Sequence, residues 1–202
     1  MNFREASERI ADIVSHVLNA PFFALYLLFI ILYNESLDVI LNLLTVVLGV
    51  LLLVIAPTAL IAIESRRGRV DYFVSDVRKR PKFFIPPLIS YILGFTIFQE
   101  LGVRTIALYY LCYFTVTLVI LLVTLKWKIS VHAAGVCGPI TFTVYVYGLE
   151  YCLLYLLVPL VAWSRVALKA HTKSQVTIGA IIAGLITYLT CLAYDEIYFL
   201  NF

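Results

Sequence analysis

The sequence has little charge, which separates it from ordinary water-soluble proteins. Charged residues make up 13% of its 202 residues, about half of the share that is usual in a soluble domain. Apolar residues make up 63%, and the mean hydropathy is +1.00. These two departures exclude a soluble globular enzyme, a disordered chain and a nucleic-acid-binding protein built on basic loops. The composition predicts a membrane protein that crosses the bilayer several times.

The signals of other architectures are also missing. No stretch alternates polar and apolar residues for long enough to predict a transmembrane β-barrel, and no repeat is visible. The 4 cysteines stand singly in apolar segments, without the spacing of a metal site or a redox motif. We therefore expect one integral membrane domain over residues 1–202, with no metal and no cofactor.

Apolar runs predict the membrane spans, because about 20 apolar residues cross a bilayer core as a helix. The three longest runs lie at residues 39–63, 105–125 and 176–194. Shorter runs, which need flanking residues or neighbouring helices to span, lie at 20–33, 83–98, 133–147 and 151–163. The pattern predicts an all-α, polytopic transmembrane bundle of seven spans, or of six if residues 20–33 only lie in the interface.

The first 19 residues differ from a secretory signal because they carry both acidic and basic side chains. Ile10, Ile13, Val14 and Val17 follow the spacing of one helix face. Residues 1–19 are therefore expected to form an amphipathic helix on the membrane surface that ends at Pro21.

The basic residues are distributed very unevenly between the two membrane faces. Seven spans would place the N-terminus and the loops 64–82, 126–132 and 164–175 on one face. All Lys and Arg residues except Arg104 then lie on that face. The positive-inside rule predicts that it is the cytoplasmic face, although an anion site there would enrich basic residues for a different reason.

Three loops on this basic face combine Arg or Lys with Ser or His. The candidate site residues are Arg78, Lys79, Arg80, Ser130, His132, Ser164, Arg165, His171 and Gln175. Arg presents a planar fork that matches phosphate oxygens, and Lys presents a point charge. Ser hydroxyls and helix N-termini add further donors. The three loops together predict a binding site for an anion.

The same residues resemble three motifs of the type 2 phosphatidic acid phosphatase (PAP2) superfamily, in the family's order. Ser164-Arg165, five residues, His171, three residues and Gln175 resemble its third motif, SRxxxxxHxxxD. Ser130-Val-His132 resembles the second motif, PSGH, and Arg80-Pro81 resembles the end of the first, KxxxxxxRP. The pattern KISxHAAG with HxxxQ is similar, in particular, to an archaeal branch of integral membrane proteins in this superfamily.

The chain departs from these motifs at several positions. Gln175 stands where the family has Asp, and Ile129 and Val131 replace the Pro and the Gly of the second motif. The first-motif Lys falls on Phe73, so one of the basic residues just before Arg80 would have to substitute for it.

The resemblance implies a PAP2-like core and a metal-independent phosphatase with a phosphohistidine intermediate. His171 would attack phosphorus, and His132 would protonate the departing oxygen. Gln175, four residues after His171, would orient its imidazole from the same helix face. The implied phosphate-binding residues are Arg78, Lys79, Arg80, Ser130, Ser164 and Arg165. The implied substrate is a lipid phosphate or pyrophosphate, with isoprenoid ones included, because the site would open at the membrane surface.

Two other functions fit parts of the sequence. A non-catalytic protein could bind anionic lipid through the basic face, and Gln175 would then mark lost activity. An intramembrane prenyltransferase would use Mg²⁺ on two carboxylate clusters. Asp71 and Asp76 resemble one such cluster, but Asp195 and Glu196 lie on the opposite face. Membrane lipids are the expected partners and nucleic acid is not, while the oligomeric state stays open.

Overall fold

The structure is a computed structural model that describes residues 3–71, 74 and 76–200. Phe73, where the first-motif Lys would fall, lies outside these residues. Over the described residues the chain is helical and contains no strand. The elements are α1 (Phe3–Val17), α2 (Ala20–Asn34), α3 (Val39–Gly49), η1 (Val50–Ile55), α4 (Ala56–Arg66), η2 (Val77–Lys79), η3 (Pro81–Phe84), α5 (Ile85–Glu100), α6 (Arg104–Thr124), α7 (Val131–Tyr147), η4 (Leu149–Leu156), α8 (Leu157–Ala167) and α9 (Lys173–Leu200).

Every apolar run of the sequence is helical in the structure, which confirms the all-α class. The helices long and apolar enough to cross a membrane are Val39–Arg66, Pro81–Glu100, Arg104–Thr124, Leu149–Ala167 and Lys173–Tyr198. A sixth span results if α1 and α2, bent by 56° at their junction, count as one. The apolar helix α7 is shorter than these. A multi-pass membrane protein is therefore supported, and the seven-span count stays a prediction.

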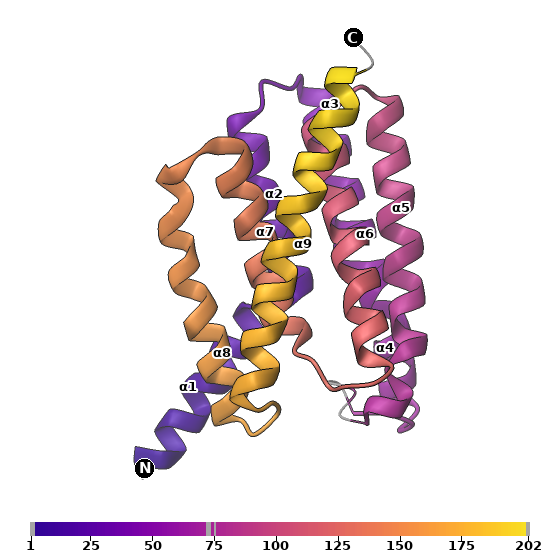
Figure 1. Cartoon of the computed structure of the whole chain (residues 1–202). Coiled ribbons are helices and arrows are strands. Elements are labelled where there is room, and N and C mark those ends of the chain that lie inside the picture. The colour runs from indigo at the N-terminus through magenta and orange to yellow at the C-terminus, as the bar shows by residue number, and fades with distance from the viewer. Residues whose placement is uncertain (1–2, 72–73, 75, 201–202) are drawn as a thin grey trace.

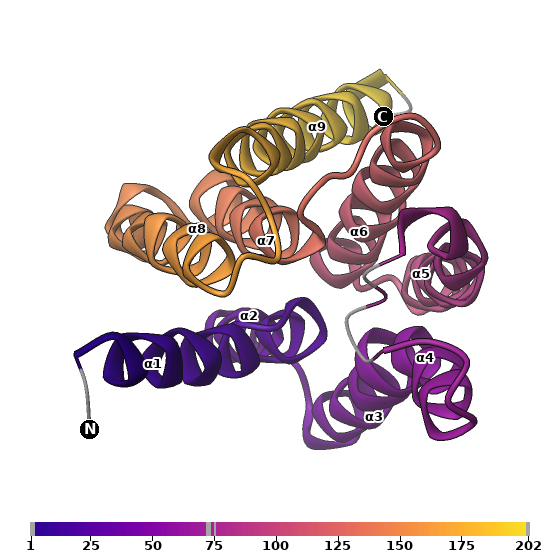
Figure 2. The same cartoon turned by 90° about the horizontal axis from the view of Figure 1, so that it is seen from below.

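Helix α7 lies at the centre of the bundle. Its 17 residues extend about 25 Å, less than the roughly 30 Å of a bilayer core. It packs against α2, α6, α8 and α9, which surround it when the bundle is seen from below (Figure 2). These neighbours shield its ends, so a short and largely buried helix is compatible with a membrane interior.

Helix α1 lies at an angle to the bundle (Figure 1). Ile10, Ile13 and Val17 are exposed on one side of it. Ala11 and Ser15 on the other side are fully buried, and α1 packs against α8. The expected amphipathic helix is present over Phe3–Val17. It does not extend to Pro21 as expected, because Pro21 lies in the first turn of α2. The place of α1 in the membrane interface stays a prediction.

The rod of α3, η1 and α4 contains a widened turn just before Pro57. Proline has no N–H and its ring clashes with the carbonyl four residues earlier, and the preceding turn is a π-helix, η1. Thr58 Oγ1 donates to the carbonyl oxygen of Val54 at 2.6 Å, which satisfies one acceptor near the break. The helix thus continues past Pro57 to Arg66.

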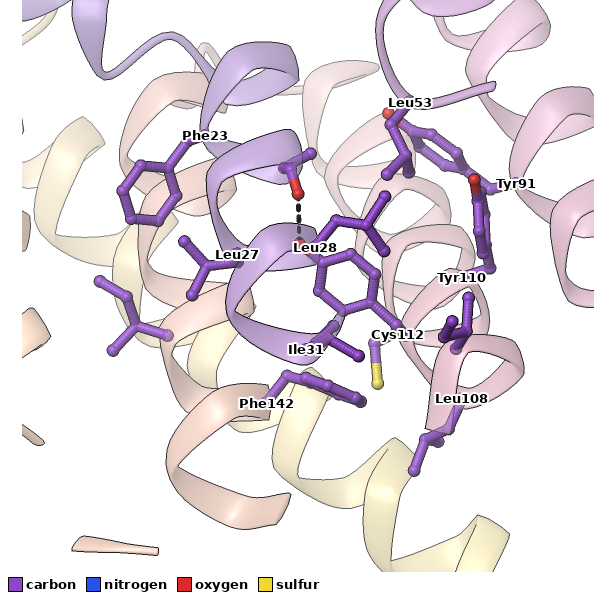
Figure 3. Close-up of a cluster of buried hydrophobic side chains, with 14 of the residues drawn as sticks. Phe23, Leu27, Leu28, Ile31, Leu53, Tyr91, Leu108, Tyr110, Cys112 and Phe142 are labelled. Carbon is purple, nitrogen blue, oxygen red and sulfur yellow. Dashed lines mark hydrogen bonds between the residues drawn. The ribbon is translucent and has the colours of Figure 1, made fainter. Parts of the chain in front are cut away.

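Buried aromatic residues fill the core of the bundle away from the basic loops (Figure 3). The Tyr109 ring centroid lies 4.9 Å from that of Phe142, and Tyr109 donates its hydroxyl to the carbonyl oxygen of Ala24 at 2.8 Å. Gly94 allows α5 to approach α6, since a Cβ there would lie 2.3 Å from the Tyr110 ring. This core holds α2, α5, α6 and α7 together.

The three basic loops lie at the same end of the bundle. The segments that follow α4, α6 and α8 all lie at the end where α2 begins, together with the N-terminus (Figure 1). The turns before α3, α6 and η4 lie at the opposite end (Figure 1). The predicted grouping of the basic loops is therefore present, and the assignment of that end to the cytoplasm stays a prediction.

Candidate anion site at the basic end of the bundle

A cavity of about 210 Å³ opens among the basic loops. Arg80, His132, Arg165 and His171 all contribute to its wall. They come from four separate segments: the turn before η3, the first turn of α7, the end of α8 and the loop before α9. The fold therefore brings four of the predicted site residues together around one space.

The turn after α8 places His171 close to Arg165. The carbonyl oxygen of Arg165 accepts from the N–H groups of Ala170, at 3.0 Å, and of His171, at 3.2 Å. Lys169 has a left-handed φ of 54°, and its N–H donates to the carbonyl oxygen of Val166 at 2.9 Å. These bonds form a Schellman helix end. The five residues between Arg165 and His171 therefore form a single turn that brings the His171 backbone back to Arg165.

Gln175 belongs to a capping box at the start of α9. Its Oε1 accepts from the N–H of Thr172 at 3.1 Å, and its own N–H donates to Thr172 Oγ1 at 3.3 Å. This reciprocal pair is typical of a Thr-x-x-Gln helix start. Because an N–H can only donate, the side-chain atom that faces Thr172 must be the amide oxygen.

The same oxygen of Gln175 lies 3.3 Å from Nδ1 of His171. An amide oxygen only accepts, so Nδ1 carries the proton and Nε2 keeps its lone pair. The predicted contact between the two side chains is present, but the predicted reason was wrong. His171 precedes α9, which begins at Lys173, so the residues share a helix cap and not a helix face.

Ser130 is the N-cap residue of α7. Its Oγ accepts from the N–H of Ala133 at 3.3 Å, and its own N–H donates to the carbonyl oxygen of Gln175 at 3.3 Å. The side chain is fully buried and is not part of the cavity wall, whereas Val131 and His132 are. The hydroxyl thus orders the helix start beside the cavity.

Arg80 ties two of the basic loops together. Its Nε donates to the carbonyl oxygen of Val74 at 2.8 Å, and its Nη1 donates to that of Ile129 at 3.3 Å. The residue is only 8% exposed. Burial lowers the pKa of Arg80, and the negative charge of Asp71 opposes this shift. Arg80 is therefore held in position beside the start of α7.

Arg165 joins α8 to α1. Its Nη1 donates to Ser15 Oγ, and both side chains are almost completely buried. Because Asn19 and Ala20 also line the cavity, the junction of α1 and α2 forms part of the wall next to this guanidinium.

The charges around the cavity are nearly all positive. Burial, together with the nearby cations Arg80, Arg165 and Lys128, lowers the pKa of His171 to about 3. Burial also lowers the pKa of Lys128, and Arg80 and Arg165 add to that shift. None of the described residues that line the cavity is acidic. The site therefore favours an anion and keeps His171 neutral at neutral pH.

Besides Ser130, three predicted phosphate-binding residues do not line this cavity. Arg78 and Lys79 are exposed, and Lys79 Nζ donates to the carbonyl oxygen of Arg69 at 3.0 Å. Ser164 is buried and donates its hydroxyl to the carbonyl oxygen of Val161 at 2.8 Å. Its position in the third motif is explained by packing inside α8.

Lys128, Ser15 and Asn19 were not predicted as site residues. Lys128 could have been found, because it lies two residues before Ser130. Ser15 and Asn19 belong to a different part of the chain, and no sequence signal links them to the site. Asp71 and Asp76, on which the transferase alternative depends, line a separate surface pocket. Within the described residues, no three His, Cys, Asp or Glu side chains gather as a metal site would require.

Comparison of the chain with protein-family models, with curated proteins and with solved structures finds no match.

Proposed function

We propose that this protein is an integral membrane phosphatase that hydrolyses a lipid phosphate or pyrophosphate through a phosphohistidine intermediate. The observation that carries the proposal is the meeting of two imidazoles and two guanidiniums around one cavity. These residues resemble the PAP2 motifs in chain order, and the loops that carry them share one end of the bundle.

In the first step, Nε2 of His171 attacks phosphorus, and a P–N bond forms as the P–O bond to the lipid breaks. His132 donates the proton that the departing oxygen needs. Arg80 and Arg165 stabilise the charge on the remaining phosphoryl oxygens. The low pKa of His171 supports its role, because a neutral imidazole has a lone pair to attack with.

In the second step, a water molecule attacks the phosphohistidine. The P–N bond breaks, His132 accepts the proton of the water, and inorganic phosphate leaves. Gln175 keeps the proton of His171 on Nδ1 throughout. Unlike the Asp of the motif, it supplies no negative charge to stabilise an imidazolium, which predicts slow turnover.

The experiment is hydrolysis of lipid phosphates by the purified protein in lipid nanodiscs, with and without EDTA. We expect phosphate release that survives EDTA, and an acid-labile, alkali-stable phosphoprotein after rapid quenching with labelled substrate. His171→Asn should abolish both signals. His132→Asn should slow turnover. With a substrate whose leaving group is poor, it should also slow formation of the phosphoprotein. Turnover that requires Mg²⁺ and an acceptor would instead identify a transferase.

A second candidate is a non-catalytic protein that binds anionic lipid in the same cavity. It is favoured by one observation, which is that the capping box with Thr172 accounts for Gln175 without any catalytic role. Absence of turnover with every lipid phosphate, together with binding that is unchanged in His171→Asn, would select this alternative.

A further inference from the structure

The cavity continues from the basic loops far into the bundle. Its wall begins at Arg80 and His132 and ends at Tyr109, Phe142 and Thr187. His132 and Phe142 are ten residues apart on α7, which corresponds to about 15 Å along the helix. The residues between these two ends are mostly apolar, from α4, α5, α6 and α7.

Aromatic rings close the inner end of the cavity. The ring centroid of Tyr109 lies 4.9 Å from that of Phe142 and 5.1 Å from that of Tyr113. Tyr109 and Phe142 are fully buried. The hydrogen bond from the Tyr109 hydroxyl to the carbonyl oxygen of Ala24 holds the Tyr109 ring against α2. Figure 3 shows Phe142 among the buried hydrophobic side chains of the core. The cavity thus has a charged open end and an apolar closed end.

We infer that the inner part of this cavity binds the hydrocarbon chain of a single-chain lipid phosphate and limits its length to roughly eight to twelve carbons. The identity of the head group rests on the proposed function. A depth of about 15 Å fits such a chain. Each C–C bond is about 1.5 Å long, and in an extended chain it adds somewhat less than this to the length along the chain axis.

The volume of the cavity favours one chain and not two. An apolar cavity of about 150 Å³ holds benzene, which has six carbons. By the same ratio, a cavity of about 210 Å³ has room for one chain of about eight carbons. A diacyl lipid would have to leave at least one chain outside.

Chain length is selected here by fit and not by the hydrophobic effect. A membrane lipid chain passes from one apolar environment to another, so burial in the protein gives it little additional stabilisation. A chain that exceeds the closed end must fold back through the mouth or displace the rings of Tyr109 and Phe142. Longer chains should therefore bind more weakly, although they partition into membranes more strongly.

This inference is tested by measuring the binding of single-chain alkyl phosphonates to the protein in lipid nanodiscs. Chains of about 8, 12, 16 and 20 carbons include lengths that fit the cavity depth and lengths that exceed it. We expect the tightest binding at about 8 to 12 carbons, and binding at least about tenfold weaker for 20 carbons and for a dialkyl phosphate. Equal binding of the 12-carbon, 20-carbon and dialkyl ligands would overturn the inference. Phosphonates are not hydrolysed, so this result is read independently of whether the protein is a phosphatase.

Two substitutions at the inner end should move the preferred length in opposite directions. Phe142→Leu deepens the cavity and should shift the optimum to longer chains. Gly138→Ala adds a methyl group to the wall, 3.1 Å from Thr187 Oγ1, and should shift it to shorter chains.

The matched control is Phe98→Leu. Phe98 is fully buried and stacks on Tyr110 at 5.6 Å, but it does not line the cavity. It should lower stability as Phe142→Leu does and leave the chain preference unchanged. If neither Phe142→Leu nor Gly138→Ala moves the optimum relative to this control, the inner cavity does not hold the chain.

Discussion

Replacing Gln175 with Glu adds one negative charge to the side-chain atom that contacts His171. Glu has the same length as Gln and also completes a capping box, so the start of α9 should keep its geometry. The relevant oxygen lies 3.3 Å from Nδ1 of His171. The substitution therefore changes the electrostatics of the imidazole with little change in structure.

The expected shift follows from the distance between the two groups. Unit charges about 4 Å apart interact by about 4 kcal/mol near a protein surface, and 1.36 kcal/mol corresponds to about one pKa unit. The carboxylate stabilises the protonated imidazole, so the pKa of His171, about 3 in the natural chain, should rise by roughly 2 to 3 units. His171 would then be neutral at pH 7 and partly protonated at about pH 5.

The assay is an NMR titration of the imidazole in isotope-labelled protein, together with kcat/KM measured against pH. In the enzyme, turnover at pH 7 should increase because the carboxylate stabilises the imidazolium, while the acid limb of the profile moves upward. In the lipid binder, the added charge should weaken anion binding and create no turnover.

The control for this prediction is Ser174→Glu. Ser174 is exposed in the same turn of α9, so it adds the same charge without contacting His171. The contact between Gln175 and His171 would be refuted if Gln175→Glu shifted the pKa of His171 by less than about one unit. It would also be refuted if Ser174→Glu shifted that pKa equally.

Three further predictions concern the charge, the packing and the topology of the site. Arg80→Gln should raise the pKa of His171, because the positive charge of Arg80 helps to lower it; an unchanged NMR titration would contradict this. Gly135→Ala should lower the melting temperature, because its Cβ would lie 2.2 Å from the first residue of α2; unchanged stability would mean that α2 and α7 are less closely packed. Single cysteines at Arg67 and Lys173, both exposed, should react from the same side of the membrane in a chain without its own cysteines. Labelling from opposite sides would contradict the seven-span topology.

The sequence by itself determined the helices of this protein. Hydropathy and helical spacing are properties of neighbouring residues, so each apolar run could be identified without knowledge of the rest. The capping box of Thr172 and Gln175 was also legible as Thr-x-x-Gln. The expectation that His171 and Gln175 share a helix face is wrong because His171 precedes α9, which begins at Lys173.

Only the tertiary structure decided which basic residues meet. Arg78, Lys79 and Arg80 are consecutive basic residues that were all predicted to bind phosphate, but Arg80 alone of the three lines the cavity. Ser130 and Lys128 lie in the same loop, and of these two only Lys128 is among the cations, with Arg80 and Arg165, that lower the pKa of His171. Charged side chains within one loop point in different directions, and local sequence does not fix which direction faces the bundle.

The depth of the cavity was also decided by tertiary packing. Tyr109, Phe142 and Thr187 belong to three different helices, and in the sequence each is an ordinary residue of an apolar run. Whether such residues fill a core or leave a space depends on how closely the helices approach one another. That approach is set by contacts such as Gly135 against α2, between segments more than one hundred residues apart. Local pattern specifies the helices, and the space between them exists only after they have packed.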